Sequence, residues 1–219
     1  MIVDEDDWIS YWDRVKSELY IPAWAEPRTL PGPSHLDALE KQLGFLLPLS
    51  YRGYARVFGG GQIARRFALW APGYPHAEAV DFPSAGVWRT WSFFGGLDPG
   101  ACNPGGADPD RVAKAERMVP FGIYLGQKGI FAWHRDAVTD PTNRDCLISF
   151  VSRFSDEPDI VLNRSFAALV TDDFLGSGFY PKYGIDVSEV ELEWEDEETG
   201  ERRTHRDFIP IGGSVAPAI

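Results

Sequence analysis

Cysteine is scarce in this chain, which has only Cys102 and Cys146 among its 219 residues. Two cysteines are too few for a disulfide scaffold, so the composition indicates a reducing compartment. Long hydrophobic runs are missing as well, since no apolar segment approaches the roughly 18 residues of a membrane span. The first twenty residues carry acids where a signal peptide would carry basic residues. We therefore expect a cytoplasmic protein with no membrane contact.

Basic residues are also few, with 21 lysines and arginines against 33 acids and a formal net charge of −12. A charge of this sign repels the phosphates of nucleic acids, which argues against direct binding of DNA or RNA. It favours attraction to a basic protein instead.

The residue patterns of common metal and catalytic sites are absent from the sequence. None of the four histidines has a partner at metal-ligand spacing: His35, His76, His134 and His205. We therefore expect no metal and no cofactor. The sequence also has no Gly-x-Ser-x-Gly nucleophile motif, and Cys146 falls in a predicted buried strand. Gly59 to Gly61 lack the lysine and hydroxyl of a phosphate loop, so we interpret them as a helix stop.

His134 is the best candidate for acid–base chemistry, because Asp136 and Asp140 follow it at the end of a predicted strand. Polar residues at strand ends are more often solvated turn residues. We therefore predict no catalytic residue, and keep as the alternative a small-molecule-binding or hydrolytic domain that uses His134 and these acids. Its cleft would lie between the sheet and a Pro/Gly-rich loop at 97–110.

What the sequence does contain begins with a pair of short helices. Ser34 can cap a first helix over 34–43, whose apolar face is Leu36, Leu39 and Leu43, and Gly44 can end it in the left-handed conformation. Pro48 suits the first position of a second helix over 48–58, whose apolar face is Tyr51, Tyr54 and Phe58. An N-terminal helix over 5–19 is predicted by the acids at 4–7, which favour a helix start, and by an apolar stripe that includes Trp8 and Trp12.

Strands dominate the second half of the chain. Apolar segments predict strands at 63–70 and 147–151, and Ser165 can cap a later helix. Helices that flank a run of strands indicate an α+β domain, an antiparallel sheet with helices packed on one face. We expect Leu39, Leu43, Tyr51 and Phe58 to pack against that sheet.

An acidic β-hairpin is predicted at 187–209, where Val190, Leu192 and Trp194 alternate with glutamates. With a turn at 197–200, Glu195 would lie opposite Arg202 and Glu191 opposite Arg206. We take the solvent-exposed face of this hairpin as the candidate partner-binding site. Its acids are Glu191, Glu193, Glu195, Asp196, Glu197 and Glu198. The whole chain, 1–219, is interpreted as a single domain with a core at about 34–175.

A series of short motifs in this core resembles the SUKH superfamily, the Smi/Knr-like proteins. In chain order they are Leu39-Glu40, Leu43-Gly44, Leu47-Pro48, Tyr51, Gly59-Gly60, Val119-Pro120-Phe121-Gly122 and Gly129-Ile130-Phe131-Ala132-Trp133. Gln127-Lys128 stands where many relatives have a Gly-Asp pair, so any role of that acid does not carry over.

The resemblance implies strands at 119–124 and 130–133 and a closing helix from Ser165 to about 175. It also implies a binding scaffold without catalysis. Bacterial members of the superfamily are mostly immunity proteins that bind and neutralise a toxin, often a nuclease or deaminase, and some fungal relatives act in cell-wall assembly through protein binding. We therefore expect an immunity protein whose partner is a cognate, basic, nuclease-like toxin. The sequence leaves the oligomeric state open.

Overall fold

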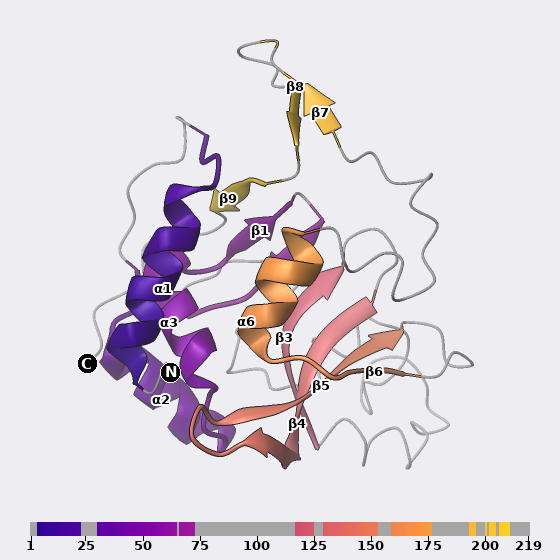
Figure 1. Ribbon diagram of the computed structural model, residues 1–219. Helices are drawn as coiled ribbons and strands as arrows, with labels where there is room; N and C mark the ends of the chain where they lie inside the picture. The colour runs from indigo at the N-terminus through magenta and orange to yellow at the C-terminus, as the bar shows by residue number, and fades with distance from the viewer. Residues whose placement is uncertain are drawn as a thin grey trace, which may run out of the picture.

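The computed structural model describes residues 4–22, 30–64, 66–72, 117–124, 129–152, 159–176, 193–195, 200, 202–204 and 206–210. They form an α+β fold of four helices and a seven-stranded antiparallel sheet (Figure 1). The helices are α1 (Glu5–Ser17), α2 (Pro33–Leu43), α3 (Leu49–Phe58) and α6 (Phe166–Ala168), which continues as the π-helix η1 (Leu169–Phe174).

The sheet has the strand order β6-β5-β4-β3-β2-β1-β9, and every neighbouring pair is antiparallel. Its strands are β1 (Gly61–Ile63), β2 (Phe67–Leu69), β3 (Met118–Tyr124), β4 (Gly129–Asp140), β5 (Asp145–Ser152), β6 (Ile160–Leu162) and β9 (Phe208–Pro210). The predicted strands at 119–124, 130–133 and 147–151 are confirmed within β3, β4 and β5. None of the described helices is long and apolar enough to cross a membrane.

The starts and ends of the helices follow from a few capping residues. The carboxylate of Asp4 accepts the Asp7 N–H at 2.8 Å and begins α1, which ends at Ser17 rather than at residue 19. The prediction that Ser34 caps α2 is wrong, because Pro33 already occupies the first helical position and Gly32 precedes it. Gly44 ends α2 at φ +59°, as predicted.

Two predicted elements differ in the structure. The strand predicted at 63–70 is two strands, β1 and β2, joined by a tight turn at which Ala64 has φ +50°. Arg65-Arg66 interrupts the apolar residues at this turn, but the segment has none of the Gly, Pro, Asn or Asp residues that usually mark a turn, which explains the error. The closing helix begins as predicted, with the Ser165 hydroxyl accepting the Ala168 N–H at 3.2 Å, but most of it is the π-helix η1.

The C-terminal segment contributes to two sheets. The predicted hairpin is present as β7 (Glu193–Glu195) and β8 (Arg202–Thr204), with Glu195 opposite Arg202 as expected. Residue 191 lies outside the described residues, so its pairing with Arg206 stays a prediction. The hairpin does not extend to residue 209, because β9 pairs with β1 in the main sheet and Phe208 contacts Phe58 there, with the ring centroids 4.8 Å apart.

The core is built mainly from aromatic side chains between the described helices and one face of the sheet. The rings of Tyr51 of α3 and Trp133 of β4 form a T-shaped pair with their centroids 4.9 Å apart. The ring centroid of Phe166 of α6 lies 6.1 Å from that of Trp133. Tyr51 is fully buried and donates a hydrogen bond from its hydroxyl to the Trp70 carbonyl at 2.7 Å.

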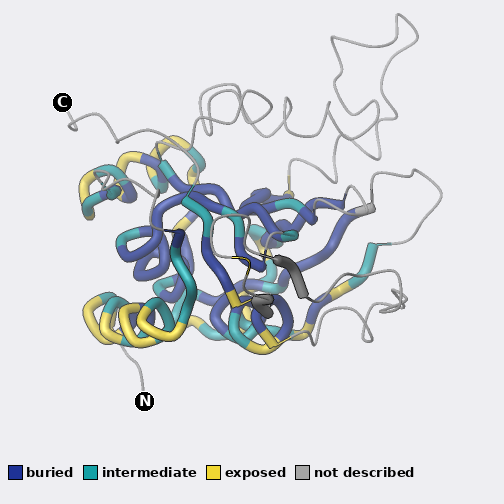
Figure 2. The backbone as a smooth tube through the Cα atoms, turned by 90° about the horizontal axis from the view of Figure 1, so that it is seen from above, coloured by how far each residue is buried: buried dark blue, intermediate teal, exposed yellow. Residues whose placement is uncertain are grey.

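Figure 2 shows the buried backbone running through the centre, with exposed residues on the outer sides of the helices. Leu39 and Phe58 are buried as predicted, and Leu43 is partly buried.

Gly53 sets the distance between α1 and α3. A Cβ at this position would lie 2.7 Å from the Cβ of Trp8 and 2.9 Å from the Trp8 carbonyl carbon. Only glycine allows the two helices to approach this closely. The close approach brings the first turn of α1 next to the polar side of α3.

Candidate functional site

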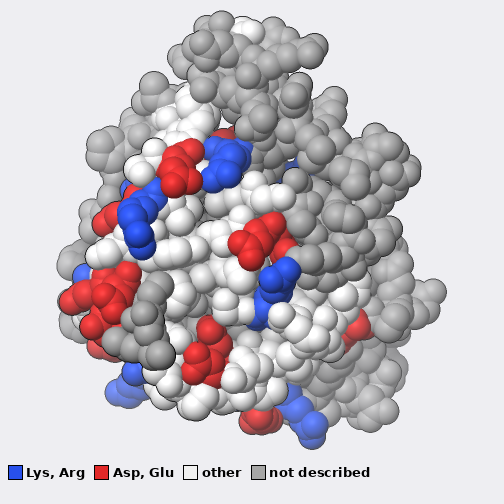
Figure 3. Space-filling view, in the orientation of Figure 1, with Lys and Arg blue, Asp and Glu red and all other residues white. Residues whose placement is uncertain are grey.

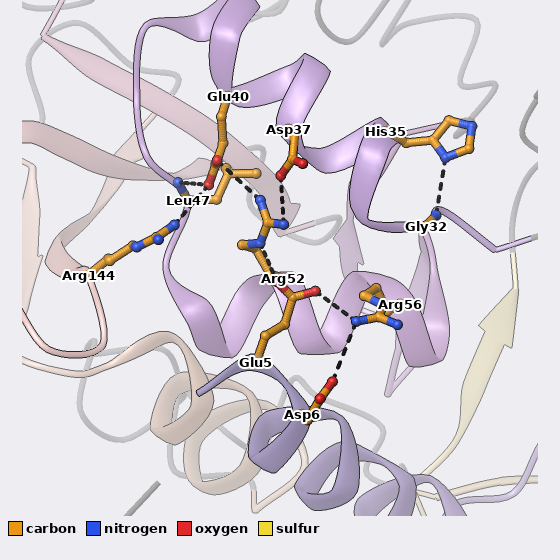
Figure 4. A network of polar contacts seen from close by, with 10 residues as sticks. All are labelled: Glu5, Asp6, Gly32, His35, Asp37, Glu40, Leu47, Arg52, Arg56 and Arg144. Atoms are coloured by element: carbon orange, nitrogen blue, oxygen red, sulfur yellow. Dashed lines mark hydrogen bonds and ion pairs between the residues drawn. The ribbon is translucent and has the colours of Figure 1, made fainter. Parts of the chain in front are cut away.

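The most connected polar group in the described structure is the guanidinium of Arg52 on α3 (Figure 4). Its side chain is 7% exposed and reaches three carboxylates. Nε donates to Glu5 at 2.6 Å, one terminal nitrogen donates to Asp37 at 2.9 Å, and the other lies 3.1 Å from a Glu40 oxygen. The three acids come from α1 and α2, so one buried cation joins three helices.

The acids around Arg52 have further partners. Glu40 accepts the Leu47 N–H at 2.9 Å and lies 3.5 Å from Arg144 in the β4–β5 turn. Glu5 also accepts from Arg56 at 3.0 Å, one turn further along α3. Asp6 lies 3.9 Å from the same Arg56 nitrogen. We call these residues the Arg52 network: Glu5, Asp6, Asp37, Glu40, Arg52, Arg56 and Arg144.

The network is arranged by helix periodicity. Arg52 and Arg56 lie four residues apart on α3, and Asp37 and Glu40 lie three apart on α2, so each pair shares one helix face. Sequence reasoning missed this network. The available signal was an arginine at position 52 within an otherwise largely apolar helix, where a buried charge requires partners.

The electrostatics of Arg52 favour a permanent charge. Burial works against the charged guanidinium, but hydrogen bonds to Glu5 and Asp37 and the charge of Glu40 outweigh it, so the pKa of Arg52 is raised. The three carboxylates hold the charged guanidinium between α1, α2 and α3, so the Arg52 network joins these helices.

His134 and Asp140, two residues of the predicted catalytic alternative, have different partners in the structure. Nε2 of His134 lies 2.8 Å from Oγ of Ser149 on the adjacent strand, and Ser149 is fully buried. Asp140 instead binds its own turn, accepting the backbone N–H of Thr142 and the side-chain amide of Asn143, each at 2.9 Å. The Asn143 amide and the turn N–H groups hold the pKa of Asp140 below its usual range.

Asp136 is exposed two residues after His134. Within the described ranges, no hydrogen bond or ion pair joins His134, Asp136 and Asp140 into one site. No group of three His, Cys, Asp or Glu side chains in these ranges could hold a metal ion.

The acids predicted to bind a partner lie mostly beyond the described part of the chain. Glu193 and Glu195 are in β7, whose backbone pairs with β8. The remaining four, Glu191, Asp196, Glu197 and Glu198, lie outside the described residues.

A second set of acids lies along α1, where Figure 3 shows red side chains over the helix. Asp4, Asp6, Asp7, Asp13 and Glu18 are exposed. Asp37 of α2, whose side chain is 65% exposed, is linked to the start of α1 through Arg52 and Glu5. We call these six residues the α1 acidic face. Arg14 is the exposed basic residue among them.

Comparison with known proteins does not place the chain in a family: no family model, no curated protein and no solved structure matches it.

Proposed function

We propose that this protein is a non-catalytic binding domain that neutralises a cognate basic, nuclease-like toxin, as SUKH immunity proteins do. The observation that carries the proposal is the contrast between the two kinds of polar group in the described structure. Those of the Arg52 network are engaged inside the protein, where the buried Arg52 pairs with the partly buried Glu5 and Glu40. The exposed ones along α1 are mainly acids that face water.

Charge complementarity supports this assignment. Nucleases grip phosphates with basic surfaces, and a protein of net charge −12 can cover such a surface and compete with the nucleic acid. The acids of the β7–β8 hairpin and the α1 acidic face are both suited to this role. The proposal places the protein in the cytoplasm, where a nuclease toxin would act.

The resemblance to the SUKH superfamily is a second line of support. Its motifs fall at structurally defined places: Leu43-Gly44 ends α2, Gly59 ends α3, and Val119 to Gly122 lie in β3. A scaffold of this kind binds through whichever surface fits its partner, so the fold alone does not name the contact residues.

The alternative, a hydrolytic domain, rests on the contact between His134 and Ser149. A hydroxyl within 2.8 Å of an imidazole has the geometry of a nucleophile and its base. However, Ser149 is fully buried in the middle of β5, so a substrate carbonyl has no path to it without rearrangement. We therefore favour the binding function.

The experiment is co-expression with any toxin-like protein whose gene lies beside the gene of this chain. If the proposal is right, this chain restores growth to cells that express the toxin and co-purifies with it. A toxin of a different type serves as the control and should still kill. Failure to protect or to bind any toxin encoded beside it would overturn the proposal.

A further inference from the structure

The β4–β5 turn, residues 141–144, connects the sheet to α1 and α3 through hydrogen bonds. The Leu49 N–H at the start of α3 donates to the Asn143 carbonyl at 2.9 Å. The Trp8 indole N–H of α1 donates to the Asn143 side-chain oxygen at 3.2 Å. Arg144 holds a backbone φ of +57°, which non-glycine residues rarely adopt, so contacts must keep the turn in this shape.

Asp145 follows this turn directly and is an unusual place for a carboxylate. It is 7% exposed, and its Oδ1 has no hydrogen-bond partner in the described structure. Ser50 of α3 is fully buried and its Oγ is likewise without a hydrogen bond of good geometry, although the hydroxyl lies close enough to favour the Asp145 carboxylate. Two buried, unsatisfied oxygens therefore face each other where the turn meets α3.

Ionised Asp145 would be poorly accommodated here. Burial disfavours the charge, the Asp140 carboxylate directly opposite in the β4–β5 ladder adds repulsion, and only Ser50 opposes them, so the pKa of Asp145 is raised to about 6. Protonated Asp145 loses the charge and gains an O–H that can be donated to Ser50 Oγ.

The other charged groups around the turn do not compensate Asp145. The pKa of Asp140 is lowered, so that carboxylate stays charged, and the pKa of the Cys146 thiol on β5 is raised by burial and by the Asp145 charge, so the thiol stays neutral. The guanidinium of Arg144 is turned to Glu40 of α2, 3.5 Å from its Oε1. Trp8 of α1 contributes only its indole N–H, to Asn143.

We propose that the contact between the β4–β5 turn and the start of α3 is a pH-sensitive switch, closed when Asp145 carries a proton and loosened when Asp145 ionises. Opening the contact would hydrate Asp145 and return it to an ordinary aspartate. The closed state is therefore favoured below about pH 4, and the preference is lost as the pH rises through about 6.

Hydrogen exchange of the Leu49 amide tests the switch, because that N–H reports the contact itself. Protection factors, which correct for the pH dependence of intrinsic exchange, are compared at pH 4.5 and pH 7.5. We expect the wild-type Leu49 protection to fall at least ~10-fold on going to pH 7.5, relative to amides in the centre of β4, since one pKa unit corresponds to a tenfold change in an equilibrium. Asp145→Asn should show the same relative protection at both pH values.

Asp136→Asn, which removes an exposed carboxylate from the same hairpin, is the matched control and should behave as wild type. A direct titration of the Asp145 carboxyl carbon by NMR in the unmodified protein accompanies these variants, with an expected midpoint near 6. A midpoint near 4, or the same pH dependence of Leu49 protection in Asp145→Asn as in wild type, would overturn the proposal.

Discussion

Arg52 and Glu5 are joined by a hydrogen-bonded ion pair, with Nε and Oε2 2.6 Å apart, and this pair fixes the first turn of α1 against the middle of α3. Both side chains are largely buried, at 7% and 19% exposure. The helix that carries the α1 acidic face is therefore held to α3 by a largely buried ion pair.

The first prediction concerns that support. Arg52→Ala should lower the free energy of unfolding by about 3–5 kcal/mol at pH 7, because it leaves the carboxylates of Glu5 and Glu40 without their buried cation. Urea denaturation gives the measurement. Arg206→Ala is the matched control: its pair with Glu18 is half exposed and should cost about 1 kcal/mol or less. Equal losses in the two variants would show that the Arg52 network does not stabilise the fold.

The second prediction concerns the crossing of α1 and α3. Gly53→Ala adds a methyl group 2.7 Å from the Trp8 Cβ, so the helices must move apart, and we expect a loss of about 1–3 kcal/mol despite the better helix propensity of alanine. Thermal unfolding measures the loss. Ser10→Ala, on the exposed side of α1, should leave the melting temperature almost unchanged. A stabilised Gly53→Ala variant would contradict the close packing described here.

The third prediction is the pH dependence of global stability. The folded-state pKa of Asp145 is raised from 3.8 to about 6, so its contribution to stability is complete below pH 4 and is lost as the pH rises through about 6. Asp145→Asn should therefore be more stable than wild type by about 1–3 kcal/mol at pH 7.5, and the difference should vanish near pH 3.5. Denaturation curves at both pH values measure it. A variant less stable than wild type at pH 7.5 would show that the ionised carboxylate is favourably accommodated.

The fourth prediction separates binding from catalysis. His134→Ala together with Asp136→Ala should leave protection against the toxin within a few-fold of wild type, because the proposed binding function requires no reaction at these side chains. Asp140 is left in place, since its carboxylate holds the β4–β5 turn through Thr142 and Asn143. Circular dichroism checks that the double variant is folded. Loss of protection by a folded double variant would favour the hydrolytic alternative.

The sequence allowed most of the fold to be predicted, because the dominant signals were local. Apolar spacing located the helices to within two residues at each described end, and Gly44 marked the end of α2 by its conformation. The turn at Ala64 and the π-helix over Leu169–Phe174 carry no comparable local signal.

The Arg52 network and the buried Asp145 could not be predicted, because their partners are distant in sequence. Arg52 pairs with residues 47 and 15 positions away, and Asp145 meets Ser50 from another element. The pattern of charges on a single helix does not indicate which of them a neighbouring helix will bury. The proposed partner-binding acids at 191–198 were predicted from alternation alone, and that alternation indicated a strand without indicating what binds it.

The fifth prediction is electrostatic. Changing Glu193, Glu195, Glu197 and Glu198 together to lysine should slow association with the toxin at least ~10-fold at low salt, with little change in the dissociation rate. The matched variant reverses Asp6, Asp7 and Asp13 of the α1 acidic face. Screening over about 8 Å at physiological salt should shrink either effect. An unchanged association rate in one variant would assign the steering to the other surface.

The most direct test of the central claim is a titration of the toxin's activity with the purified protein. A binding protein predicts that activity falls in proportion to the protein added, reaches zero at a fixed molar ratio, and does not depend on the time of preincubation. If a small fraction of that ratio abolished activity after long incubation, the protein would be destroying the toxin or its product, and the non-catalytic account would be wrong.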